Sequence, residues 1–173
     1  MTSRRRALAL LLVALPLSAC GFHLRGTASA TLPPALAGLQ STMPGLLVDP
    51  PLLVEVRNAL RAHGIEADAH GPALVLLGEQ FQVEVLAIDT TGRVSDYLLN
   101  YALRYQVNDA AGAPLIAPIS IKLQREQSFD RLNVLATEKE QTFLKESMRT
   151  QAIDQLLRQL AHWRPAAEPA RAP

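Results

Sequence analysis

The chain has 173 residues, of which 49% are hydrophobic and 19% charged, and its formal net charge is +1. This length and apolar fraction suit one globular domain with a packed core. A strongly basic domain would be the expected footprint of nucleic-acid binding, so the near-neutral charge gives no support for a nucleic-acid partner.

The N-terminal segment has the pattern of a lipoprotein signal. Arginines at positions 4–6 precede an apolar run from Ala7 to Leu17. About ten apolar residues are too few to span a hydrocarbon core of roughly 30 Å, so a cleaved signal explains the run better. Leu17-Ser18-Ala19-Cys20 resembles the bacterial lipobox, whose cysteine is acylated and becomes the first mature residue. We therefore expect a signal peptide at residues 1–19 and lipidation of Cys20; the alternative is an ordinary signal peptide with an incidental cysteine.

Cleavage before Cys20 changes the charge balance of the chain. It leaves 154 residues and removes three of the 17 basic residues, so that 14 basic residues face 16 acidic ones and the net charge is −2. Because Cys20 is the only cysteine, no thiol remains for a disulfide, a metal or a nucleophile. We expect a single domain over residues 20–164, with a tether at 20–35 and a disordered, proline-rich tail at 165–173.

A first helix is indicated after a weak strand signal between Leu36 and Thr42. Asp49 is a good N-cap, and a proline pair follows it where the missing N–H is tolerated. Apolar residues then recur at helical spacing as far as Leu60, and Gly64 suits a left-handed C-terminal cap.

Three long strands are predicted next, because the hydrophobic period changes to two. Alternation is clear in Glu79–Val85, in Val94–Val107 and again from Ile119 onward. Thr90-Thr91-Gly92 and the segment from Asn108 to Pro114 supply turns between them. Short connections of this kind predict an antiparallel meander.

A long helix is expected to close the domain. Thr137-Glu138-Lys139-Glu140 matches a capping box, and Pro165 would end a helix of some 26 residues, roughly 40 Å long. The predicted apolar stripe comprises Leu144, Met148, Ala152, Ile153, Leu156, Leu157, Leu160 and Trp163. The elements together predict an α+β fold: a two-layer sandwich with a mostly antiparallel sheet of about four strands, both helices on its apolar face and a polar face opposite.

Catalytic and metal-binding patterns are not found at useful specificity. The four histidines lack ligand spacing, and carboxylate pairs such as Glu79 with Glu84 are interpreted as solvated strand residues. We therefore expect a protein that is not an enzyme and uses no cofactor or metal.

Two residue groups are candidates for binding. Tyr97, Tyr101 and Tyr105 share one strand face and are interpreted as core or rim aromatics, with a stacking platform as the alternative. Basic residues lie near the predicted turn and helix start and on the polar sheet face, where they either gather at one end of the sheet or form a normal mixed-charge surface. They are Arg93, Arg104, Lys122, Arg131 and Lys139.

Several segments resemble the LPS-assembly lipoprotein LptE family. The string Cys20-Gly21-Phe22-His23-Leu24-Arg25-Gly26 resembles the start of its mature members. Similarity extends to about Leu160 and omits the proline-rich connector and the tail. The other segments of this chain that resemble the family are Val56–Ile65, Gly92–Tyr105, Ser128-Phe129-Asp130 and Glu140-Gln141.

The resemblance implies a non-enzymatic outer-membrane lipoprotein that plugs the lumen of the LptD β-barrel translocon, binds lipopolysaccharide and helps to insert it into the outer leaflet. Gly21, rather than an aspartate, after the lipidated cysteine fits sorting to the outer membrane. Lipopolysaccharide phosphates would pair with cations. The candidates are Arg93 first and Lys139 second, followed by Arg131 and Lys122.

Two other classes remain open. One is a lipoprotein adaptor that binds another envelope-assembly machine through a sheet edge. The other is a lipid-anchored hydrolase with a dispersed site. Thr90 also departs from the resemblance, which would place a basic side chain at that position.

Overall fold

The structure is a computed structural model that describes residues 32–42, 50–130 and 134–164. The expected signal peptide, Cys20, most of the tether, Arg131 and the tail lie outside the described residues, so their assignments stay predictions. The elements in chain order are η2 (Pro34–Leu36), β1 (Gln40–Thr42), α2 (Pro50–Ala62), β2 (Ala73–Ile88), β3 (Val94–Asn108), β4 (Pro114–Ser128) and α3 (Val134–His162).

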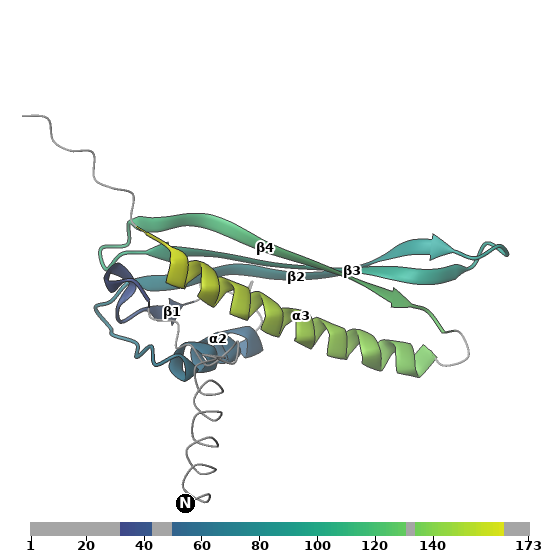
Figure 1. The fold of residues 1–173 in the computed structure, drawn as a ribbon, viewed down its shortest axis with the longest axis horizontal. Coiled ribbons are helices and arrows are strands. Elements are labelled where there is room, and N and C mark those ends of the chain that lie inside the picture. Colours follow the sequence, from purple (N-terminus) through teal and green to yellow (C-terminus); the bar gives the residue numbers. More distant parts are fainter. Residues whose placement is uncertain (1–31, 43–49, 131–133, 165–173) are drawn as a thin grey trace, which may run out of the picture.

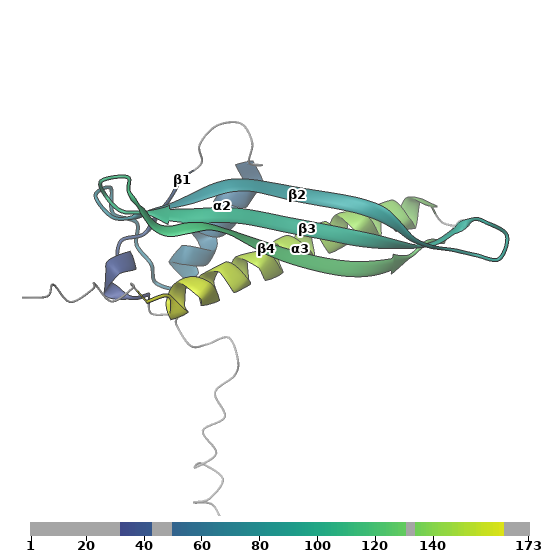
Figure 2. The same ribbon diagram turned by 90° about the horizontal axis from the view of Figure 1, so that it is seen from above.

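The described chain forms two layers, as Figure 1 shows, with α2 and α3 both on one face of an open sheet. The strand order is β1-β2-β3-β4. The long strands β2, β3 and β4 pair antiparallel, and the short β1 joins β2 in parallel. Seen from above, the three long strands run side by side and α3 crosses beneath them (Figure 2). The predicted fold class is therefore confirmed, and the weak strand signal before Thr42 corresponds to β1.

The two hairpin loops share one construction. In the first, the Asp89 carboxylate accepts the Arg93 N–H at 3.0 Å while the Asp89 carbonyl accepts the Gly92 N–H at 2.9 Å. Gly92 has φ +76°, a left-handed conformation that glycine adopts without a steric cost. Asp109 and Gly112 repeat these contacts in the loop between β3 and β4. Local side-chain hydrogen bonds thus specify both reversals.

The ends of α2 follow the sequence closely. The helix begins at Pro50, as predicted, although the expected cap Asp49 lies outside the described residues. At its C-terminus Gly64 has φ +73°, its N–H donates to the Arg61 carbonyl, and the Ile65 N–H donates to the Leu60 carbonyl. These two hydrogen bonds are those of a Schellman motif.

The expected capping box of α3 is wrong. The helix begins at Val134, so Thr137 lies inside it and is buried. Glu140 instead accepts a hydrogen bond of 2.8 Å from the Gln127 side chain of β4. The 29 residues of α3 give a rod of about 44 Å at 1.5 Å per residue. No helix among the described residues has the length and apolarity to cross a membrane.

The core lies between the sheet and the two helices. The predicted stripe of α3 is buried or partly buried along its whole length, and Leu99, Tyr101, Leu103, Tyr105 and Val107 of β3 face it. In β2 the inward face changes parity, because the pairing register shifts between Leu76 and Gly78. Leu74 and Leu76 point inward before this bulge, and residues of odd number do so after it.

The sandwich opens toward the hairpin that joins β2 to β3, hereafter the distal end. Figure 1 shows α3 diverging from the sheet in this direction, and α2 lies at the opposite, proximal end. Val83 and Val85 have the inward parity but are 40% and 56% exposed. This part of β2, expected to be half-buried, is therefore largely open.

Candidate functional surfaces

A cluster of charged side chains, two of them buried, joins both helices to the sheet. Arg149 of α3 donates to both carboxylate oxygens of Glu79 of β2, at 2.8 and 3.0 Å, and to Glu55 of α2 at 3.0 Å. The Tyr101 hydroxyl of β3 donates to the same Glu79 carboxylate at 2.8 Å. The side chains of Arg149 and Glu79 are each 6% exposed, whereas that of Glu55 is 39% exposed. The Arg149–Glu79 pair therefore holds charge that water does not screen.

Burial and neighbouring charges shift the pKa values of Arg149, Tyr101 and Tyr105. Burial by itself lowers the pKa of Arg149, but its hydrogen bonds to Glu79 and Glu55 outweigh that effect and raise the pKa. Burial, followed by the nearby Glu79 carboxylate, raises the pKa of Tyr101 well above its ordinary range. Burial also raises the pKa of Tyr105 to about 12, and its hydroxyl donates to Gln159 of α3 at 2.7 Å. Both tyrosines thus serve as core residues with bonded hydroxyls, as predicted.

The interpretation of Glu79 as a solvated residue is wrong, and Arg149 was missed. Glu79 shares the parity of Phe81 and pairs with Leu103, so it faces the helices. Arg149 lies within the apolar stripe of α3, between Met148 and Ala152. The sequence did contain a signal for this pair. Glu79 and Arg149 have opposite charges and each occupies a position that faces the core, and buried charges require partners.

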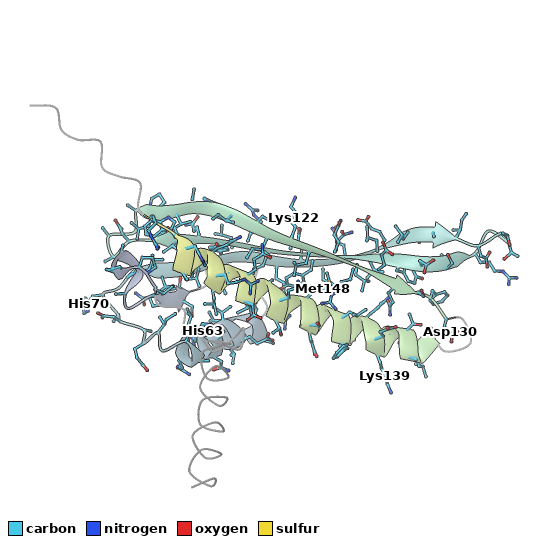
Figure 3. All side chains as sticks on the ribbon, viewed as in Figure 1. His63, His70, Lys122, Asp130, Lys139 and Met148 are labelled. Atoms are coloured by element: carbon cyan, nitrogen blue, oxygen red, sulfur yellow. The ribbon has the colours of Figure 1, made fainter. Side chains whose placement is uncertain are left out.

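Two of the predicted cationic residues share the distal end. Arg93 is exposed in the hairpin loop, which projects beyond the ends of β4 and α3 in both ribbon views (Figures 1 and 2). Asp96 pairs with Ser128, so β4 ends near this loop and leads the chain toward the start of α3. Lys139 is exposed there, but Figure 3 shows its side chain pointing away from the sheet.

Of the other predicted cations, Lys122 does not join this pair. Lys122 lies on the face of β4 that is free of helices (Figure 3), six residues before Ser128, which is about 20 Å along the strand. Arg131 lies outside the described residues. Of the two alternatives left open by the sequence, a gathering of cations at one end would thus involve, within the described chain, only Arg93 and Lys139.

The helix-free face is polar and slightly hollowed. Gln82, Asn100 and Gln124 lie in register across β2, β3 and β4, and the Gln124 amide donates to Asn100 at 2.8 Å. A shallow concave region of about 390 Å³ includes this row, and Lys122 and Glu84 also line it. Such a surface offers many weak polar contacts and no concentrated charge. Among the described residues no group of three or more His, Cys, Asp or Glu side chains could hold a metal ion.

Comparison with known proteins agrees with this architecture. A family described as LptE, lipopolysaccharide-assembly, matches residues 41–160. The LPS-assembly lipoprotein LptE of Photorhabdus laumondii is 31% identical over 165 residues, covering 91% of this chain and 86% of that protein. The protein of the same name from Yersinia enterocolitica is 32% identical over 166 residues, covering 91% of this chain and 76% of its own length.

Solved structures show the same fold. The rare lipoprotein B of Shewanella oneidensis superposes with a TM-score of 0.61 at 26% identity, covering 71% of this chain and 92% of that one. A lipoprotein B from Nitrosomonas europaea gives a TM-score of 0.66 at 25% identity, covering 82% and 90%. The chain is thus an open-faced α+β domain of the kind found in these lipoproteins. Together with the sequence match over residues 41–160, this shows that it belongs to the LptE lipopolysaccharide-assembly family, so the resemblance seen in the sequence is confirmed.

Proposed function

We propose that the chain is a non-enzymatic outer-membrane lipoprotein that fills the lumen of the LptD β-barrel, takes part in its assembly, and binds lipopolysaccharide during insertion into the outer leaflet. Membership of the LptE family is the observation that carries the proposal. The polar helix-free face supports it, because the lumens of large outer-membrane barrels are themselves polar.

The dimensions of the domain suggest how it would sit. The 16 residues of β2 span about 50 Å, roughly twice the height of the apolar band of such a barrel. The domain would therefore extend beyond the membrane. The described chain starts at the proximal end, so an anchor at Cys20 would hold that end on the periplasmic side. The distal hairpin with Arg93 would then point into the lumen, where lipopolysaccharide phosphates would meet it.

Site-specific cross-linking in cells tests the lumen arrangement. A photo-reactive residue would be placed at Gln124 on the helix-free face and, separately, at Glu146 on α3, both of which are exposed. Since a lumen surrounds its plug, both positions should cross-link to one polypeptide of the size of a large barrel. An adaptor bound through one sheet edge would cross-link from one side only, and that result would contradict the proposal.

Lipid anchoring is tested separately at Cys20. Cys20→Ala should leave an uncleaved or mislocalised precursor, because a lipobox is processed only after its cysteine is acylated. Multiple acyl chains each contribute about 0.8 kcal/mol per buried CH₂, so the wild-type anchor is effectively permanent. A normally cleaved, membrane-retained Cys20→Ala protein would show that Cys20 is incidental.

A further inference from the structure

The outer edge of β2 is open along most of its length. β1 pairs only with Ala73–Val75, and beyond these residues no strand of the described chain lies on this side of β2. The register with β3 is regular from Gly78 to Val85, between two bulges. This eight-residue stretch, the β2 edge, exposes a row of N–H and C=O groups to the outside.

The opposite edge of the same sheet carries more of the features that discourage strand addition than the β2 edge does. β4 carries Pro118, Lys122 and Arg125 along its middle, and proline and basic side chains are devices that discourage a further strand. The β2 edge has no proline, lysine or arginine. It has two carboxylates: Glu79 forms a buried ion pair with Arg149, and only Glu84 is exposed. The β2 edge is therefore the less protected of the two edges of the sheet.

The side chains of the β2 edge alternate in character. Val83 and Val85 point toward the helix side, where α3 has diverged from the sheet, and are 40% and 56% exposed. Gln80, Gln82 and Glu84 point to the helix-free face and are exposed. A strand paired here would need apolar side chains on the first face and polar ones on the second, with a basic residue favoured beside Glu84.

We propose that the β2 edge accepts an amphipathic strand of the partner barrel while that barrel is still open, so that the domain takes part in assembly through strand addition. The inference rests on the proposed barrel partner. Strands of outer-membrane barrels alternate apolar and polar residues over about ten positions, which is the pattern that this edge requires. Such strands have free edges only before the barrel closes. The added strand would continue the sheet along the edge that β1 begins.

The probe is a labelled synthetic peptide of about ten residues that alternates valine or leucine with threonine or asparagine and carries one lysine on its polar side. A peptide of the same composition in shuffled order is its control. Binding to the lipoprotein in detergent would be followed by fluorescence anisotropy, and amide hydrogen exchange would locate it. We expect the alternating peptide to bind and to slow exchange in residues 78–85, because strand addition engages backbone amides.

A gatekeeper substitution makes the assay specific. Val83→Lys should weaken peptide binding about tenfold or more, while Leu135→Lys, at a 72% exposed position of α3, should change it by less than about twofold. Circular dichroism would check that both variants fold, and Val85→Lys replaces Val83→Lys if the latter does not.

Each of several results would overturn the proposal. These are no binding of the alternating peptide, unchanged exchange at residues 78–85 in the bound state, or equal weakening by Val83→Lys and Leu135→Lys. A dimer that protects residues 78–85 without peptide would assign the edge to a second copy of the chain. The lumen cross-linking of Gln124 and Glu146 is independent of all these results, so failure of strand addition and failure of the plug function can be told apart.

Discussion

Replacing Arg149 by methionine is the most direct test of how the two helices are held to the sheet. Methionine keeps much of the volume of the side chain but removes the guanidinium that serves both carboxylates. Glu79, 6% exposed, would then keep only the Tyr101 hydroxyl as a partner among the contacts described above. An uncompensated buried carboxylate of this kind costs about 3 to 5 kcal/mol.

The two glutamates of the cluster should respond very differently. Glu55→Gln should cost only about 0 to 1 kcal/mol, because Glu55 is 39% exposed and water screens its ion pair. Glu79→Gln keeps an acceptor for Tyr101 and should cost about 1 to 3 kcal/mol. In the double variant Arg149→Met with Glu79→Gln, the loss should be smaller than the sum of the single losses, because no buried charge is left unpaired.

Urea unfolding followed by far-UV circular dichroism would measure these differences in the free energy of unfolding. A domain of this size has about 5 to 15 kcal/mol in total, so Arg149→Met should shift the midpoint strongly. If Arg149→Met cost no more than Glu55→Gln, water would be reaching Glu79, and the argument from burial would fail. Additive losses in the double variant would show that the pair is not coupled.

Three further predictions concern the core, the alkaline limit and the distal end. Leu156→Ala should lower the free energy of unfolding in urea by about 2 to 5 kcal/mol because Leu156 is fully buried. Phe143→Ala, at a 66% exposed position, should change it by no more than about 0.5 kcal/mol. Equal effects would mean that the stripe is not packed. The pKa of Tyr105 rises from 10 in the unfolded chain to about 12 in the folded protein, so folding favours its neutral form. This contribution to stability is fully present below about pH 10 and is lost as the pH rises through 12. Tyr105→Phe should therefore flatten the decline in stability at alkaline pH, as measured by thermal unfolding. Replacing both Arg93 and Lys139 by Asp should weaken lipopolysaccharide binding by the lipoprotein at low salt and have a smaller effect at high salt, while barrel cross-linking is retained. Unchanged affinity at low salt would show that the distal end is not the contact site.

Much of the fold follows from local patterns in the sequence. Alternation with period two predicted the three long strands, and helical spacing predicted α2 and the buried stripe of α3. The aspartate and glycine residues of each hairpin loop form contacts with neighbours a few residues away, so turns are also encoded locally. The segments that resemble the LptE family were readable for the same reason, since they are contiguous strings.

Tertiary structure alone decided the features on which the binding surfaces depend. Arg149 meets partners 70 and 94 residues away, so its role in joining the layers is invisible to any local period. The bulge in β2 reverses which parity faces inward. The divergence of α3 leaves Val83 exposed despite its apolar character, and the short β1 leaves the β2 edge open. These outcomes depend on how elements of unequal length pack against one another, and periodicity specifies the face of an element but not what covers it.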